Sequence, residues 1–404
     1  MRLLIGGDTY APDINGAARF VERLAHGMAE RGHEVHVICP SPTGPAGPEP
    51  VRHLGGGTLT VHRVRSHKTP IHETFRVSWP WQAKAETRAL VAAIDPDLVH
   101  VQSHFIVGRG IAYAADQLGL PLVATNHFMP ENLTGYFNIP RALDRLVGRL
   151  AWRDFARVYG RAAAITAPTP RAVELLRTAT DIGDDAQAIS CGIDVNLYWN
   201  ATLTARAAGT AAERAVPTVL FVGRLDQEKR VNELLRAFAG LPAELPARLE
   251  IIGDGDRRAD LHRLAAHLGL GPDRVRFLGF VDDEQLLRAY GRADVFCMPG
   301  VAELQSLVTL EAMSAGKPVV AADAMALPHL VHPGRNGWLF TPGDVAGLRD
   351  RLASLLGDAG LRARMGEESR RMVAPHALAD TLDAFEAVYD RVRDRARTPV
   401  TTAA

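Results

Sequence analysis

The feature that most constrains the fold is a regular alternation of short apolar runs with longer segments of helical periodicity. Residues 35–39, 98–101, 122–125 and 163–166 are mostly apolar runs, each too short for a helix, and helix-length segments lie between them. Strands that alternate with helices pair in parallel, and the helices cover both faces of the sheet. The alternation therefore predicts an α/β protein.

The same pattern occurs twice along the chain. A chain of 404 residues exceeds what one hydrophobic core normally holds, so two domains are expected. Residues 1–197 form the first predicted domain and residues 217–375 the second, while residues 198–216 are rich in Ala and Thr and predict a linker. A helix at about 378–396 follows and is expected to complete the first domain.

Composition and charge exclude some classes of protein. Lys plus Arg equals Asp plus Glu at 46 each, so no overall field favours a nucleic-acid partner. No stretch approaches the roughly 20 apolar residues of a spanning helix, and Gly6 interrupts the N-terminus too early for a signal peptide. We expect a cytoplasmic protein, at most peripheral on the inner face of a membrane. Cys39, Cys191 and Cys297 lack metal-ligand spacing and predict buried thiols.

The loop after the first strand does not match the G-x-G-x-x-G dinucleotide fingerprint, which argues against an NAD-dependent oxidoreductase. Gly16 precedes a predicted helix, where backbone can approach a ligand and the helix N-terminus favours an anion. An ordinary glycine at a loop–helix junction explains Gly16 equally well.

Two cations follow the first strand of the second domain. Arg224 and Lys229 stand five residues apart in one loop. Such a pair can neutralise a nucleotide diphosphate where no metal does so. Surface charge without a role is the alternative.

Two carboxylates flank a predicted helix start further on. Ser306 is a candidate N-cap, and Leu307 and Val308 open the helix. Glu303 is then expected in the preceding loop and Glu311 on the second turn. The free N–H groups at such a helix start would bind phosphate.

The Glu-x7-Glu pattern of Glu303 and Glu311, with the Arg224–Lys229 loop and residues 315–321, resembles the retaining glycosyltransferase family 4. The motifs at 192–194, 253–255, 280–281 and 333–340 are also similar to that family. The resemblance covers nearly the whole chain, closest to actinobacterial glycolipid-type or natural-product glycosyltransferases. It implies the GT-B fold, two Rossmann-like domains facing across a cleft.

The resemblance also implies an activity. A hexose would pass from a UDP- or GDP-linked sugar to a hydroxyl acceptor, with retention, by a front-face mechanism that needs no metal or other cofactor. Glu303 and His127 would contact the transferred sugar, and Arg224 and Lys229 the leaving diphosphate. The expected donor-binding residues are Gly16, Asp254, Gly255, Val281, Ser306, Leu307, Val308 and Glu311, and the acceptor-side candidates are Tyr10, Asn15, His104 and Asn126.

The chain departs from the family pattern after Glu303. Many relatives have Glu-Gly-Phe-Gly where this chain has Glu303-Leu304-Gln305-Ser306. Glycines there let the backbone approach the donor sugar, so the identity of that sugar stays open. Asp282 and Asp283 could suggest an ion site, but they stand in a turn without further ligands, and we interpret them as a solvated pair.

The acceptor has two interpretations. Arginines recur every fourth residue from Arg141 to Arg161 in a predicted helix with interspersed apolar residues. This pattern fits an anionic membrane surface, and hence a lipid acceptor such as diacylglycerol or phosphatidylinositol. A solvated helix face with internal pairs to Asp144 and Asp154 is the alternative, and a soluble metabolite or antibiotic would then be the acceptor. The oligomeric state stays open.

Two other classes of protein compete with a transferase. A nucleotide-sugar epimerase shares the GT-B fold but is not expected to carry this Glu-x7-Glu context. A periplasmic binding protein would need a signal peptide.

Overall fold

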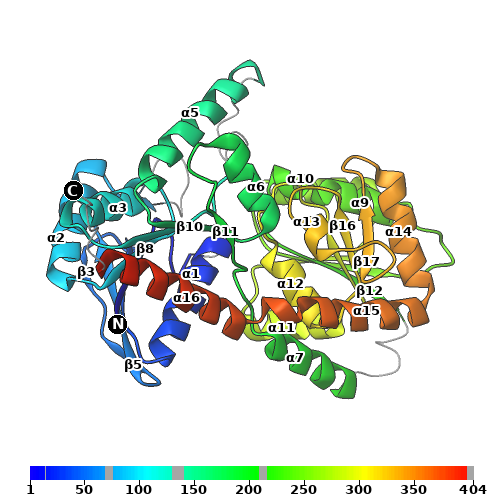
Figure 1. Ribbon diagram of the computed structural model, residues 1–404. Coiled ribbons are helices and arrows are strands. Elements are labelled where there is room, and N and C mark those ends of the chain that lie inside the picture. The colour runs from blue at the N-terminus through cyan, green and yellow to red at the C-terminus, as the bar shows by residue number, and fades with distance from the viewer. Residues whose placement is uncertain (14, 69–75, 130–140, 209–215, 398–404) are drawn as a thin grey trace. The chain divides into compact units, whose positions relative to one another are not determined.

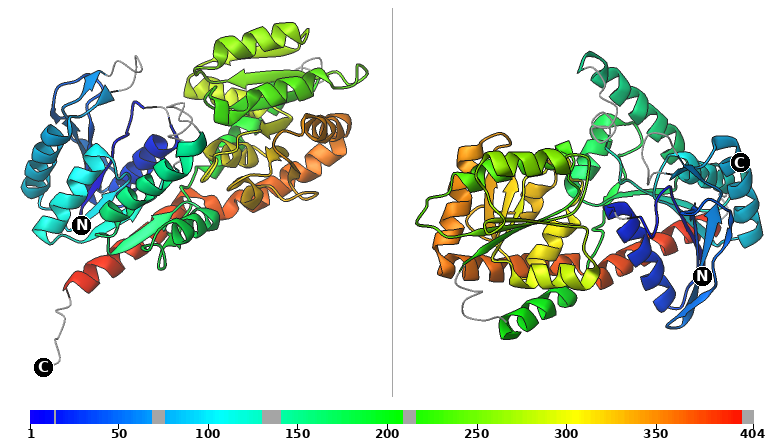
Figure 2. Two further views of the ribbon diagram at one scale, coloured as in Figure 1. Left: turned by 90° about the horizontal axis from the view of Figure 1, so that it is seen from above. Right: turned by 180° about the vertical axis from the view of Figure 1, so that it is seen from behind.

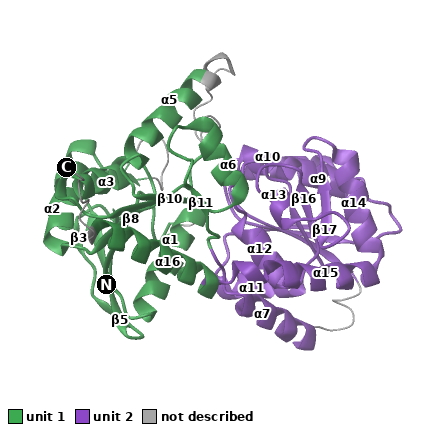
Figure 3. Ribbon diagram, in the orientation of Figure 1, with its two compact units in different colours: residues 1–130, 139–191, 379–404 green, residues 131–138, 192–378 purple. Residues whose placement is uncertain are grey.

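The computed structural model describes residues 1–13, 15–68, 76–129, 141–208 and 216–397. The described chain divides into two compact units (Figure 3). Unit 1 takes in the described residues of Met1–Pro130, Ile139–Cys191 and Ala379–Ala404, and unit 2 those of Gly192–Leu378. Each unit is built around its own mainly parallel sheet, which confirms the α/β prediction.

Unit 1 contains a nine-stranded sheet with the order β11-β10-β9-β8-β1-β2-β5-β3, and β4 pairs with β5 (Figure 1). β3 and β4 run antiparallel to β5, and the other pairs are parallel. The strands are β1 (Arg2–Gly6), β2 (Glu34–Pro40), β3 (Gly47–Pro48), β4 (Arg52–Leu54), β5 (Gly57–Val64), β8 (Leu98–Val101), β9 (Leu122–Thr125), β10 (Ala164–Ala167) and β11 (Gln187–Ala188), while β6 (His67–Lys68) and β7 (Arg76–Val77) form a separate pair.

Helices lie on both faces of this sheet (Figure 2). They are α1 (Gly16–Glu30), α2 (Pro80–Ile94), α3 (Ile106–Leu118), α5 (Arg141–Tyr159), α6 (Pro170–Ala179) and α16 (Leu378–Arg397). β8 and β9 are buried along their whole length, as expected for central strands covered on both faces. α16 buries Phe385 and Tyr389 in unit 1, where Phe385 packs on Phe20 with ring centroids 5.7 Å apart. Unit 1 therefore includes this late helix together with the start of the chain.

Unit 2 contains a six-stranded, fully parallel sheet with the order β14-β13-β12-β15-β16-β17. Its strands are β12 (Thr218–Val222), β13 (Arg248–Ile252), β14 (Val275–Gly279), β15 (Val295–Met298), β16 (Val319–Ala322) and β17 (Gly337–Phe340). Its helices are α7 (Val195–Ala208), α9 (Val231–Ala239), α10 (Arg258–His267), α11 (Asp283–Arg292), α12 (Leu307–Ser314), α13 (Leu327–Leu330), α14 (Val345–Gly357) and α15 (Ala359–Val373), with short 3₁₀ turns η1 (Gln227–Lys229) and η2 (Ala374–His376).

The segment predicted as a linker is instead helical in its first part. Residues 198–208 belong to α7, and residues 209–215 lie outside the described residues. α7 packs on α11 and α12, where the Tyr198 ring meets Tyr290 at 5.4 Å and Thr202 Oγ1 donates to the Ala315 carbonyl at 2.9 Å. The helix lacks apolar periodicity because it buries only a narrow face through Tyr198 and Thr202. The low apolar periodicity of residues 198–208 is therefore a property of this helix and does not mark a linker.

The three cysteines are buried thiols that form no disulfide among the described residues, in agreement with the expectation from their spacing. Across the described parts of the chain, none of the helices has the length and apolar character that crossing a membrane requires.

Candidate active site

The order of strands in unit 2 defines where a ligand can bind. β12 pairs with β13 on one side and with β15 on the other, so the strand order reverses at β12. In open parallel sheets, the loops on the two sides of such a reversal run to opposite faces of the sheet at the carboxyl ends of the strands. Ligands of open parallel sheets bind at such a switch point.

Lys229 and Glu303 meet at this switch point. Lys229 ends the 3₁₀ turn after β12, and Glu303 lies in the loop between β15 and α12. Lys229 Nζ lies 2.5 Å from Glu303 Oε1, with 14% and 11% of the two side chains exposed. The backbone N–H of Val301 donates to the Glu228 carbonyl at 3.0 Å and ties the two loops together. Two residues predicted separately from the sequence therefore form one ion pair.

Arg224 is held by carboxylates of its own loop. Its guanidinium lies 2.8 Å from Asp226 Oδ2 and 3.0 Å from Glu228 Oε1. Burial raises the pKa of Glu228, and the neighbouring cations Lys229 and Arg224 oppose that shift. Sequence reasoning missed Asp226 and Glu228, although both stand between the two predicted cations. The loop orients Arg224 through these contacts and leaves 42% of its side chain exposed.

The helix after Glu303 begins where it was predicted. Ser306 is the N-cap residue of α12, but its hydroxyl accepts from Thr309 Oγ1 at 2.9 Å and does not cap a backbone N–H. The N–H groups of Leu307 and Val308 have no partner within an α-helix. They are therefore the donors that this helix start offers to an anion.

Glu311 lies on the second turn of α12, as predicted. It is 6% exposed, and its Oε2 accepts a hydrogen bond from the Tyr290 hydroxyl at 2.9 Å. Tyr290 was not found from the sequence, because it lies on α11, 21 residues earlier. The contact fixes the direction of the Glu311 carboxylate.

The loops after β13 and β14 carry the remaining donor-side predictions. Asp254 is exposed and pairs with Arg258 at 2.9 Å. Gly255 has φ +159°, and a Cβ at that position would lie 2.7 Å from the Leu225 N atom, so the loop after β13 approaches the loop after β12 closely. Val281 is half-buried and directly precedes Asp282, the N-cap of α11.

Asp282 has a structural role. Its carboxylate accepts from the Gln285 N–H at 2.7 Å, and the Gln285 side chain accepts from the Asp282 N–H in return. This capping box accounts for Asp282 without an ion.

Unit 1 has a second switch point, between β1 and β8. Asp8, after β1, accepts from the Ser103 hydroxyl at 2.5 Å and from the Val107 N–H at 2.7 Å. Asn15 caps α1, since its Oδ1 accepts from the Ala18 N–H at 2.9 Å, and Gly16 is the exposed first residue of that helix. Tyr10 is buried, with the Arg63 guanidinium 5.6 Å from its ring centroid.

His127 follows β9 and is neutral at physiological pH. Burial lowers its pKa to about 4. Its Nε2 lies 3.0 Å from Gln102 Oε1, and its ring packs on Phe20 with centroids 5.0 Å apart. Gln102 was not singled out from the sequence.

Three of the predicted acceptor-side residues have a buried polar side-chain atom that makes no hydrogen bond to a described residue. Tyr10 Oη, His104 Nδ1 and Asn126 Nδ2 have no hydrogen-bond partner among the described residues. His104 is enclosed by Phe105, Phe128 and other aromatic rings, and burial lowers its pKa to about 4. An unmet buried polar group costs about 1–3 kcal/mol.

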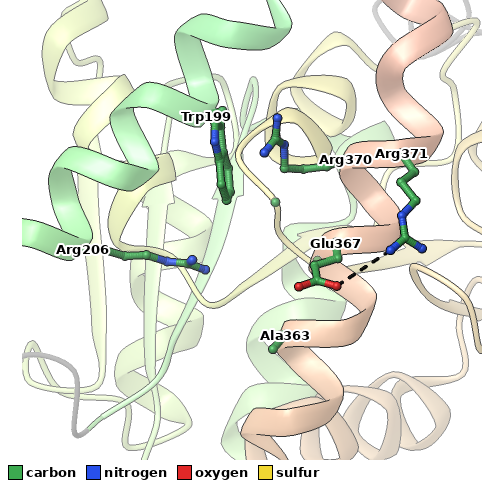
Figure 4. Close-up of a pocket in the computed structure, with 8 residues that line it drawn as sticks. Trp199, Arg206, Ala363, Glu367, Arg370 and Arg371 are labelled. Carbon is green, nitrogen blue, oxygen red and sulfur yellow. Dashed lines mark ion pairs between the residues drawn. The ribbon is translucent and has the colours of Figure 1, made fainter.

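A hollow lined by residues of α7 and α15 lies away from the predicted site residues. It has a volume of about 410 Å³ and lies between α7 and α15 (Figure 4). Trp199 lines it, with the Arg370 guanidinium 3.8 Å from its ring centroid, along with Arg206 and Arg371. This stacking packs α7 against α15, so the hollow is separate from the switch point.

The α5 surface is both basic and apolar where it is described. Arg149, Arg153 and Arg157 are exposed on it, together with Leu146 and Leu150. The predicted internal pairing of Asp154 is wrong, because Asp154 instead pairs with Arg109 of α3. Arg161 pairs with Asp116 at 3.1 Å. The side chains of Arg141, Asp144 and Arg145 lie outside the described residues.

Comparisons with known proteins agree with this architecture. A family model described as "Glycosyl transferases group 1" matches residues 208–372, and one described as "Glycosyltransferase Family 4" matches residues 14–197. The chain is 31% identical over 405 residues to a GDP-mannose-dependent alpha-mannosyltransferase of Mycobacterium tuberculosis, with 98% of each chain covered. It is 29% identical over 392 residues to a phosphatidyl-myo-inositol mannosyltransferase of Mycobacterium leprae, with 95% of each covered.

Solved structures show the same fold. Sucrose-phosphate synthase from Thermosynechococcus elongatus matches with a TM-score of 0.80 at 20% identity, covering 98% of this chain and 100% of the other. The two parallel sheets and these matches define a glycosyltransferase of the GT-B fold. The chain belongs to glycosyltransferase family 4.

Proposed function

We propose that this glycosyltransferase moves a hexose from a nucleotide-diphosphate sugar to a hydroxyl acceptor, with retention of anomeric configuration and without a metal ion. The Lys229–Glu303 pair at the switch point of unit 2 is the observation that carries the proposal. In this proposal the cation contacts the diphosphate, and the carboxylate beside it contacts sugar hydroxyls. Arg224 and the first N–H groups of α12 add further donors for the leaving group.

The donor we propose to test first is GDP-mannose. The relative from Mycobacterium tuberculosis is named as GDP-mannose-dependent, and it aligns over 98% of this chain. UDP-sugars stay in the panel because Leu304 and Ser306 stand where many members of the family have glycine.

For the acceptor, we propose a polyhydroxylated group carried on a lipid. The relative from Mycobacterium leprae is named a phosphatidyl-myo-inositol mannosyltransferase, which supports an inositol lipid as the acceptor. The exposed arginines and leucines of the α5 surface favour adsorption to anionic lipid. A soluble acceptor is the alternative that the assay must separate.

The experiment is a panel of GDP- and UDP-sugars in which nucleotide release is measured with a lipid extract, with water-soluble polyols, or without an acceptor. The Glu303→Gln variant provides the background rate. We expect release with at least one donor and stimulation by the lipid extract. Release no faster than that of the variant with every donor would overturn the proposal. NMR of the product would show the anomeric configuration, and inversion would refute the retaining mechanism.

A further inference from the structure

A chain of hydrogen bonds connects His127 to the interior of unit 1. His127 Nε2 lies 3.0 Å from Gln102 Oε1, and Gln102 Nε2 lies 3.0 Å from His100 Nε2. His100 Nδ1 then lies 2.7 Å from the Tyr389 hydroxyl on α16. Gln102, His100 and Tyr389 are at most 3% exposed, whereas His127 is half-buried. The chain therefore leads from a closed interior to a ring that is partly accessible.

The amide of Gln102 links the protonation of the two rings. A primary amide donates at its nitrogen end and accepts at its oxygen end. With the nitrogen facing His100, Nε2 of that ring must be the acceptor and its proton resides on Nδ1. With the oxygen facing His127, Nε2 of that ring must carry the proton. In this orientation one amide favours opposite tautomers in the two rings, Nδ1–H in His100 and Nε2–H in His127.

Other contacts hold both rings in place. The Thr125 hydroxyl lies 2.7 Å from His100 Nε2, and His100 packs on Phe385 with centroids 5.3 Å apart. Phe20 lies against both His127 and Phe385. Neither ring can turn over without breaking these contacts, so the orientations of both rings are held.

We propose that Gln102 is a positioning residue, which holds His127 in the Nε2–H tautomer and leaves Nδ1 as the acceptor for a sugar hydroxyl. The proposal rests on the proposed function, in which His127 contacts the transferred sugar. A neutral imidazole has one accepting nitrogen, so the wrong tautomer would present an N–H to the ligand. Burial keeps the pKa of His127 near 4, so the neutral ring is the form that needs a fixed tautomer.

The test is the tautomer of His127 in the full chain without substrate. Long-range proton–nitrogen NMR of protein labelled with ¹⁵N-histidine reports which ring nitrogen is protonated, and a His127→Asn variant assigns the signals. We expect Nε2–H at neutral pH in the wild type. A wild-type ring with its proton on Nδ1 would overturn the proposal, and this result needs no variant to fold.

Gln102→Met removes both ends of the amide at similar volume. We expect a mixture of His127 tautomers and a fall in kcat of about tenfold, the size of one lost hydrogen bond. Nucleoside diphosphate affinity should not change, because the predicted diphosphate contacts belong to unit 2. A normal tautomer, or a shifted tautomer with unchanged kcat, would overturn the positioning role.

Gln82→Met is the matched control. Gln82 Oε1 lies 3.0 Å from His67 Nε2 in the same unit, so this variant loses a similar Gln–His bond elsewhere. It should leave the His127 tautomer and kcat unchanged. If no donor in the panel is turned over, the proposed function fails, yet the tautomer spectra still test whether Gln102 sets the state of His127.

Discussion

Removing the cation of the Lys229–Glu303 pair should separate its contribution to folding from its contribution to donor binding. In the Lys229→Met variant, Glu303 keeps a carboxylate that is 11% exposed but loses its counter-charge 2.5 Å away. Breaking a buried pair by truncating one partner costs about 3–5 kcal/mol. Because both side chains keep some access to water, we expect the lower end, about 3 kcal/mol of unfolding free energy.

The same variant should bind nucleoside diphosphate less tightly. A hydrogen bond to a charged group contributes about 1.5–3 kcal/mol, which corresponds to an increase in Kd of about 10- to 150-fold. The double variant Lys229→Met/Glu303→Gln removes both charges, so it should recover most of the stability and none of the affinity. Urea unfolding measures the first quantity, and calorimetry with UDP and GDP the second.

A matched control breaks a different ion pair of unit 2. Arg292 lies 3.2 Å from Glu250, which is 9% exposed, on elements that carry no predicted donor contact. Arg292→Met should lower stability and leave nucleotide affinity unchanged. If Lys229→Met behaves like this control in calorimetry, Lys229 does not contact the diphosphate, and the assignment of the switch point as the donor site is refuted.

Three further predictions follow from the same site and from the buried histidines. Glu303→Gln should lower kcat and kcat/KM together without weakening nucleoside diphosphate affinity, whereas Glu311→Gln should weaken the binding of both donor and nucleoside diphosphate product. Steady-state kinetics and calorimetry that show no difference between the two variants would contradict these roles. Turnover should persist in excess EDTA, and loss of activity that Mg²⁺ or Mn²⁺ restores would contradict the metal-independent mechanism. Stability should fall below about pH 6.5, because burial holds the pKa of His100 at about 3 and of His127 at about 4, while unfolded histidine titrates near 6.5. The stabilisation is complete above the pKa of the unfolded histidine and decreases as the pH falls towards the pKa values of the folded state, with a loss of about 2 kcal/mol for each ring at pH 5. An unfolding free energy that does not change between pH 7 and 5 would contradict this prediction.

The fold was predictable because its signals are local. The apolar runs at 98–101 and 122–125 match β8 and β9, and Ser306 does precede α12. Buried parallel strands need continuous apolar runs, and a helix start needs a suitable residue at one position. The sequence did not predict α7 as a helix because its buried face consists of Tyr198 and Thr202, which leave no helical apolar pattern.

Contacts between residues that are distant in the sequence could not be predicted from local sequence patterns. Lys229 and Glu303 are 74 residues apart, and only the order of the strands brings their loops together. Gln102 gave no signal, because a lone glutamine after a strand has no pattern of its own. Its contacts to His100 and His127 depend on how β8 and β9 are paired in register.

The placement of α16 has a consequence for biosynthesis. Unit 1 includes the start of the chain and also this late helix, whose Glu386 pairs with Arg31 and His33 of the N-terminal part and whose Tyr389 contacts His100. On the ribosome, all of the first sheet is made before α16, with residues 192–377 in between. The interior of unit 1 therefore closes only after α16 has been made, although most of unit 1 is synthesised earlier. This reverses the usual order, in which the N-terminal domain folds first. A nascent chain arrested before residue 378 should consequently expose the first sheet to chaperones.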